Sequence, residues 1–255
     1  MIPHEIPELE LYKKALRLRT TVAYAIDVQT STVGVEFDFE NGSCLVHIPP
    51  LILSDKALGL SVLVYILCRV KNSEIDPLFG VGIISDRYKN LSSEYRDQFE
   101  SDMYLLGATA TFLSKVWVCD VRHSHWPHMT YDDHKRYREF LEDAVKEGTL
   151  GQLMTYGHAF SFAQYLIEAH RYELVETQDF SFALDVLPLN VRAFIEYLVR
   201  VCQELPRLTG DKEHDIPLFQ EWANTLIYMM DIDSIHPRII LEDGRLKWTL
   251  GAIYS

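Results

Sequence analysis

The chain has 255 residues, of which 48% are hydrophobic and 24% are charged, a composition typical of globular proteins. Its 37 acidic residues outnumber its 24 basic residues, which gives a formal net charge of −13. Because binding to a phosphate backbone requires a basic surface, this balance argues against a nucleic-acid partner.

The N-terminal segment and the apolar runs bear on where the protein acts. Residues 1–14 contain no basic start followed by an apolar stretch, so we expect no signal peptide. The longest apolar run, at 57–68, is much shorter than the roughly 20 residues that span a bilayer. A zinc ribbon or a disulfide framework is disfavoured, because no CxxC pair occurs among Cys44, Cys68, Cys119 and Cys202. We therefore predict a cytoplasmic protein with no membrane partner.

The first part of the chain predicts a helix followed by strands. Residues 8–19 have apolar positions at helical spacing, and residues 21–28 are rich in β-branched and aromatic side chains. Residues 33–39 alternate between apolar and polar, and a second strand-like run follows at 44–48. The Asn-Gly pair between these two runs predicts an antiparallel hairpin, because both turn residues tolerate positive φ.

The pattern from residue 54 to about residue 230 is helical. We expect a nearly all-apolar helix around 160–167 and further helices that begin near Asp55, Glu94, Thr130, Asn190 and Asp215. Residues 238–250 then predict a second hairpin around the Glu-Asp-Gly turn at 242–244.

No repeat or long linker interrupts the chain, so we predict one α+β domain over residues 1–255. The domain is expected to be predominantly α-helical. A small antiparallel hairpin near the N-terminus should pack on a helical body, and a short hairpin should lie at the C-terminal end. Residues 150–230 are expected to form the helical C-terminal half.

The order of three segments is the most informative feature for function. An apolar helix over Ser61–Lys71 is followed by a segment from Gln98 to Asp102, and then by Ser-His-Trp-Pro at 124–127 with Arg136 downstream. Over residues 33–140 this order resembles the frame of zincin-type metallopeptidases, in which HExxH and ExxAD helices precede a segment reading SHPP. Two histidines four residues apart on a helix can share a zinc ion, and the glutamate between them can reach the bound water.

The residues that would perform this chemistry are replaced here. Tyr65 and Arg69 stand at the histidine positions, Ile66 at the base position and Gln98 at the third-ligand position, whereas Asp102 keeps its usual identity. Because arginine retains its proton and isoleucine cannot carry one, the resemblance implies a degenerate, pseudo-peptidase frame. We expect an Arg69–Asp102 ion pair, flanked by Tyr65 and Gln98, to brace the two helices in place of a metal. The structural alternative is that this stripe is the core face of an amphipathic helix.

A second feature is the trio His123, His125 and His128, which has several carboxylates nearby in the sequence. Imidazole and carboxylate groups suit zinc, so the three histidines are candidate metal ligands. The alternative, which we favour, is a polar surface loop anchored by Trp126 and Pro127, because catalytic zinc sites usually draw ligands from separate elements. On that interpretation the protein has no cofactor.

These observations favour a non-catalytic, cytoplasmic protein-interaction or scaffold protein with a protein partner. The zincin-type resemblance implies a regulatory or defence-associated role. Two alternatives stay open: a metal-dependent hydrolase that uses zinc at the three histidines, and a helical structural subunit of a homo-oligomer.

Overall fold

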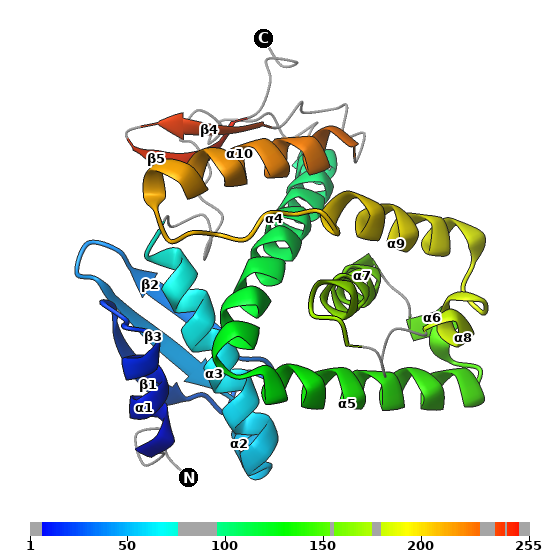
Figure 1. The fold of residues 1–255 in the computed structure, drawn as a ribbon, viewed down its shortest axis with the longest axis horizontal. Coiled ribbons are helices and arrows are strands. Elements are labelled where there is room, and N and C mark those ends of the chain that lie inside the picture. The colour runs from blue at the N-terminus through cyan, green and yellow to red at the C-terminus, as the bar shows by residue number, and fades with distance from the viewer. Residues whose placement is uncertain are drawn as a thin grey trace.

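The protein is represented by a computed structural model that describes residues 7–75, 96–153, 156–174, 180–229, 238–242 and 244–249. Only the backbone is described over 96–106. The fold is α+β and predominantly helical, with a three-stranded sheet near the N-terminus and a two-stranded hairpin near the C-terminus (Figure 1). This architecture confirms the predicted fold class.

The sheet contains β1 (Thr21–Ile26), β2 (Gly34–Asp38) and β3 (Ser43–Ile48) in the order β1-β3-β2. β2 and β3 form the predicted antiparallel hairpin, and Gly42 in their turn has a φ of 60°. β1 pairs with β3 in parallel, an arrangement that the sequence pattern did not predict. A period of two identifies a strand, but it sets neither the neighbour of the strand nor its direction.

Helices precede and follow this sheet. α1 (Pro7–Ala15) comes before it, and α2 (Pro50–Ser54) and α3 (Lys56–Ser73) come after it. The carboxylate of Asp55 caps α3 by accepting the backbone N–H of Ala57 at 2.9 Å and of Leu58 at 3.1 Å. The predicted start of this helix is therefore confirmed, because the cap satisfies N–H groups that have no partner within the helix.

α4 (Arg96–His125) is a 30-residue helix that runs through the middle of the molecule (Figure 1). It contacts α3, α5, α7 and α10. The remaining elements are α5 (Pro127–Lys146), α6 (Leu150–Leu153), α7 (Tyr156–Arg171), α8 (Ser181–Leu184), α9 (Leu189–Cys202), α10 (Lys212–Met229), β4 (Arg238–Glu242) and β5 (Arg245–Thr249).

The junction of α4 and α5 differs from the sequence prediction. His123 and His125 lie in the last turns of α4 and His128 lies in the first turn of α5, so this segment is not a surface loop. α4 continues to His125 because no strong helix breaker occurs before Pro127. Pro127 is the first residue of α5, a position whose backbone N–H has no partner within the helix, so the lack of an N–H in proline is tolerated there. Thr130 was expected to begin α5 but lies inside it, fully buried.

Two groups of buried apolar residues share α4. The N-terminal core joins α1, the sheet and α3, and it includes Leu9, Val22, Val46, Ile48, Leu63 and Leu67. The C-terminal core joins α4 to the later helices and the C-terminal hairpin, and it includes Phe112, Trp117, Phe162, Phe180, Leu198, Phe219 and Ile239. α4 places Val118 in the first core and Trp117 in the second, so this helix ties the two halves of the fold together.

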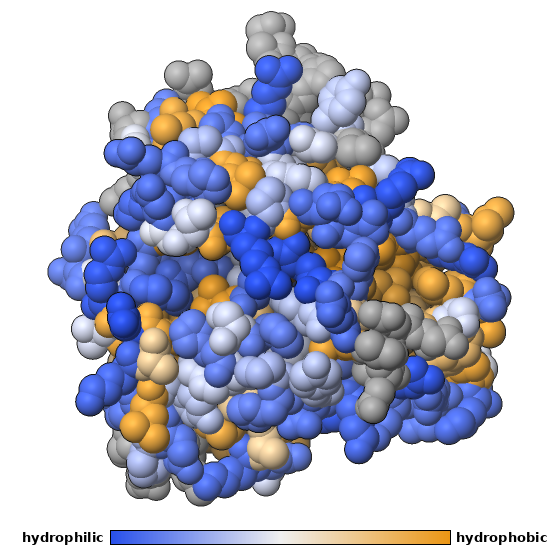
Figure 2. Space-filling model, viewed as in Figure 1, coloured by the Kyte–Doolittle hydropathy of each residue, from blue (hydrophilic) through white to orange (hydrophobic). Residues whose placement is uncertain are grey.

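Exposed large hydrophobic side chains are distributed over several elements, and they include Leu11, Leu51, Phe140, Leu189 and Tyr228. On the face drawn in Figure 2, hydrophobic areas are separated by hydrophilic ones. No helix in the described ranges is long and apolar enough to cross a membrane.

The contact between α2 and α3 depends on Gly59. A Cβ at this position would lie 2.6 Å from the backbone carbonyl oxygen of Ile52. Gly59→Ala should therefore push the two helices apart and lower the free energy of unfolding by about 1–3 kcal/mol, although alanine has the better helix propensity. Gly107→Ala in α4 is the control, because a Cβ there meets nothing within 4 Å. Gly107→Ala should raise the free energy of unfolding by about 0.5–1 kcal/mol. Urea unfolding measures both, and a Gly59→Ala variant as stable as the parent would contradict this packing.

Candidate functional site

A cleft of about 680 Å³, here called the central cleft, opens where α3, α4, α5 and α7 meet. Apolar side chains form most of its walls, and a group of charged and polar side chains lies among them. The lining residues are Leu58, Ser61, Val62, Tyr65, Cys119, Arg122, Asp133, Arg136, Tyr137, Phe140, Gln164, Tyr165 and Glu168.

The carboxylate of Asp133 connects three of these helices. It accepts a hydrogen bond from Ser61 Oγ of α3 at 3.0 Å, and it forms ion pairs with Arg122 of α4 and Arg136 of α5. The Asp133 side chain is 15% exposed and that of Arg122 only 6%, whereas that of Arg136 is 41% exposed. The ion pair between Asp133 and Arg122 is thus largely removed from solvent. Salt screens such a pair much less than it screens an exposed one.

A second carboxylate joins α7 to α5. Glu168 is fully buried, and its Oε2 lies 3.1 Å from Nε2 of the equally buried His134. Gln164 donates to Glu168 at 2.6 Å and contacts the Cys119 sulfur at 3.2 Å. Burial alone would raise the pKa of Glu168, but the hydrogen bond and charge of His134, the charge of Arg122 and a hydrogen bond from Cys119 together lower this pKa. Glu168 is therefore a carboxylate at neutral pH.

Aromatic rings form one wall of the central cleft. The Tyr137 and Tyr165 rings stack at 3.8 Å between centroids, and the Arg122 guanidinium lies 5.7 Å from the centre of the Tyr65 ring. Burial raises the pKa of the Tyr65 phenol, and it raises that of the Cys119 thiol well above the ordinary value. Both groups are therefore protonated at neutral pH, and the Cys119 thiol is a poor nucleophile.

A second cavity of about 410 Å³ adjoins the central cleft, since Gln164 lines both. It lies between α4 and α7 and contains Lys115, Phe112 and Phe160. Burial lowers the pKa of Lys115, while nearby Cys119 and Glu168 act in the opposite direction. Lys115 thus places another basic side chain close to the Glu168 carboxylate.

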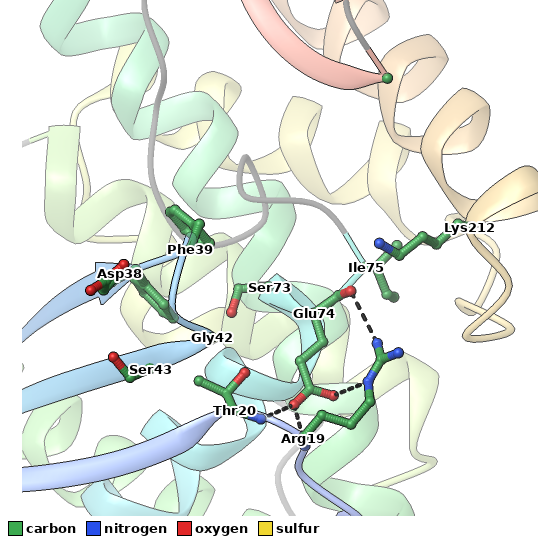
Figure 3. Close-up of a pocket in the computed structure, with 12 residues that line it drawn as sticks. Arg19, Thr20, Asp38, Phe39, Gly42, Ser43, Ser73, Glu74, Ile75 and Lys212 are labelled. Atoms are coloured by element: carbon green, nitrogen blue, oxygen red, sulfur yellow. Dashed lines mark hydrogen bonds and ion pairs between the residues drawn. The ribbon is translucent and has the colours of Figure 1, made fainter.

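A third cavity, of about 430 Å³, lies between the sheet and the ends of α3 and α10 (Figure 3). There the Glu74 side chain, only 4% exposed, accepts the backbone N–H groups of Arg19 at 2.6 Å and Thr20 at 2.8 Å. Burial alone would raise the pKa of Glu74, but these hydrogen bonds and Lys71 lower it. Because its carboxylate already ties the start of β1 to the end of α3, we assign Glu74 a structural role.

The residues predicted for the degenerate zincin-type site are only partly described. Tyr65 lines the central cleft, and the charge of Arg69 acts on its phenol. Burial lowers the pKa of Arg69. Gln98 and Asp102 belong to α4, but their side chains lie outside the described residues. The Arg69–Asp102 brace therefore stays a prediction.

The three candidate metal ligands have separate surroundings. The His123 ring stacks on Tyr172 at 4.0 Å between centroids, and burial lowers the His123 pKa. His125 Nδ1 lies 2.9 Å from the Val121 carbonyl oxygen, and His128 is exposed on α5. Among the described residues, no group of three or more histidine, cysteine, aspartate or glutamate side chains is placed to hold a metal ion. The zinc site stays a prediction without a described ligand set.

The sequence analysis did not select most of the polar residues of the central cleft. Arg122, Asp133, Gln164 and Glu168 were not proposed as site residues. One signal was available: Gln164 and Glu168 are four residues apart in a largely apolar stretch of α7. Polar residues at that spacing share one helical face and need partners when the face is buried.

Comparison with known proteins gives no similarity to interpret: no family model, no curated protein and no solved structure matches this chain.

The buried Glu168–His134 pair predicts a large loss of stability when the carboxylate is removed. Glu168→Ala should lower the free energy of unfolding by about 3–5 kcal/mol, because it leaves buried donors without their acceptor. Asp143→Ala is the matched control, since Asp143 pairs with Lys146 where both side chains are more than 70% exposed. That change should cost less than about 1 kcal/mol. Equal losses in chemical denaturation would contradict a special role for Glu168.

Proposed function

We propose that this chain is a non-catalytic protein-interaction module that acts in the cytoplasm and holds a segment of a partner protein in the central cleft. One observation carries the proposal: the cleft combines apolar and aromatic walls with two arginines that pair with one half-buried carboxylate, that of Asp133. Tyrosine, phenylalanine and arginine are the side chains enriched in the energetically dominant parts of protein interfaces.

The mouth of the cleft supports this proposal. Phe140 is 44% exposed and Leu58 is 36% exposed, and both line the cleft. Tyr137 lies beside Phe140, with 6.0 Å between the ring centroids. A partner that covers these side chains would remove apolar surface from water, which favours association.

The protonation and pairing of the polar groups favour binding over covalent chemistry. The Cys119 thiol and the Tyr65 phenol are held in their protonated forms by burial. The Glu168 carboxylate is occupied by His134 and Gln164, and the Asp133 carboxylate by Ser61, Arg122 and Arg136. Groups paired in this way position a ligand more readily than they transfer a proton or attack an electrophile.

The cysteines support the cytoplasmic part of the proposal. All four, Cys44, Cys68, Cys119 and Cys202, are buried free thiols. Unpaired thiols are the usual state in a reducing compartment. A regulatory role on a degenerate zincin-type frame is a separate hypothesis, and binding in the central cleft does not depend on it.

Peptide selection on the immobilised full chain tests the proposed function. Peptides enriched from random libraries should bind the parent protein and lose at least fivefold in affinity on Phe140→Ala, because an aromatic anchor at the mouth is removed. Tyr228→Ala is the control, since Tyr228 is an exposed aromatic residue on α10, outside the cleft lining. It should leave affinity unchanged. If no library yields a peptide whose binding depends on Phe140, the proposed function is wrong.

A further inference from the structure

We propose that the central cleft recognises the free C-terminal carboxylate of its partner, with the apolar last side chain of the partner packed against the tyrosine wall. This inference rests on the proposed function and adds the chemistry of the group that is bound. The ligand is therefore a peptide end that carries one negative charge beside an apolar side chain.

The charges at Asp133 are not balanced. One carboxylate faces two guanidinium groups, those of Arg122 and Arg136, and both are positively charged at any physiological pH. Glu168, the other carboxylate of the cleft lining, is paired with His134 and Gln164. Asp133, Arg122 and Arg136 together carry one positive charge, on a protein whose formal net charge is −13. A ligand carboxylate would neutralise this charge, and arginine is the side chain best shaped to bind carboxylates.

Arg122 has an unused hydrogen-bond donor. The residue is 5% exposed and lines the cleft, and its Nε has no hydrogen-bond partner among the described residues. A buried donor without an acceptor costs free energy. This Nε has almost no solvent-accessible surface, so it meets an acceptor only when the Arg122 side chain shifts as a ligand enters the cleft. A carboxylate has two oxygens, which allows it to contact Arg122 and Arg136 together.

The walls indicate what is attached to the carboxylate. Tyr65, Tyr137 and Tyr165 supply ring surface, and Leu58, Val62 and Phe140 extend the apolar surface to the mouth. An apolar side chain next to the carboxylate would bury these surfaces at the same time as the charge is neutralised. A ligand with a hydrophilic side chain next to its carboxylate would leave these apolar walls exposed to water.

The shape favours the end of a chain over its middle. Helices α3, α4, α5 and α7 all contribute to the cleft, and Cys119 and Glu168, both buried, lie on its inner side. A cavity of about 680 Å³ is within the range of small-ligand pockets, so it has room for only a short piece of chain. A segment that passed through would need room for backbone on both sides of its acidic side chain. A chain end needs it on one side only.

The test compares two peptide libraries on the full-length chain, one displayed with random free C-termini and one with random free N-termini and a blocked C-terminal end. Free C-termini with apolar last residues should be enriched. The leading peptide is then synthesised as the acid and as the C-terminal amide. Isothermal titration should give at least tenfold tighter binding of the acid, because the amide removes the charge that Arg122 and Arg136 recognise.

Arg136→Gln supplies the residue-level test. It should weaken binding of the acid at least fivefold and weaken binding of the amide much less, so that the ratio of the two affinities falls. Arg192→Gln is the matched control, because the Arg192 side chain is 39% exposed against 41% for Arg136 and also pairs with carboxylates, but lies on α9. It should change neither affinity. Arg136 is chosen because its side chain is 41% exposed against 6% for Arg122, so its replacement disturbs the fold less.

Several results would overturn the inference. Equal affinity of acid and amide, or an Arg136→Gln variant that binds the acid as well as the parent does, contradicts carboxylate recognition. Octanoate that binds more tightly than the peptide acid and displaces it assigns the cleft to a small fatty acid instead. If peptides with a blocked C-terminus bind as well as free acids and their affinity depends on Phe140, the proposed function stands and only this inference fails. If no peptide depends on Phe140, both fail.

Discussion

The half-buried carboxylate of Asp133 is the constraint on which the central cleft depends. It connects Ser61 of α3, Arg122 of α4 and Arg136 of α5, so three helices meet at one side chain. A hydrogen bond between helices fixes their relative position more narrowly than apolar contact does, because it depends on direction as well as distance. The spacing of the cleft walls, and with it any binding there, follows from this group.

Glu168 performs the corresponding role between α7, α5 and α4 in the same cleft. Its pairing with His134 joins α7 to α5, and Gln164 links it to Cys119 of α4. Buried ion pairs contribute little net stability compared with apolar residues of the same size, yet loss of one partner is costly. We interpret the network as a device that specifies geometry, while Trp117, Phe162 and the other core residues supply most of the stabilisation.

Local rules explain what the sequence could predict. The β2–β3 hairpin followed from an Asn-Gly pair, and the start of α3 followed from the Asp55 cap, because each depends on adjacent residues. The parallel pairing of β1 and the contacts of Asp133 depend on segments far apart in the chain: Ser61 and Asp133 are separated by 72 residues. Tyr65 was selected because it stands at a histidine position of the zincin-type frame, and it does line the cleft. The partners of Arg122 and Glu168 lie on other helices, which only packing brings together.

A double-mutant cycle on Arg122 and Asp133 tests the central claim most directly. The free energies of unfolding of Arg122→Ala, Asp133→Ala and the double variant, measured against the parent, give the energy that couples the two side chains. The account predicts a coupling of about 1.5–3 kcal/mol, the range expected for a hydrogen bond between charged groups shielded from solvent. A coupling below about 0.5 kcal/mol would show that the two residues act independently, and would contradict a cleft held in shape by Asp133.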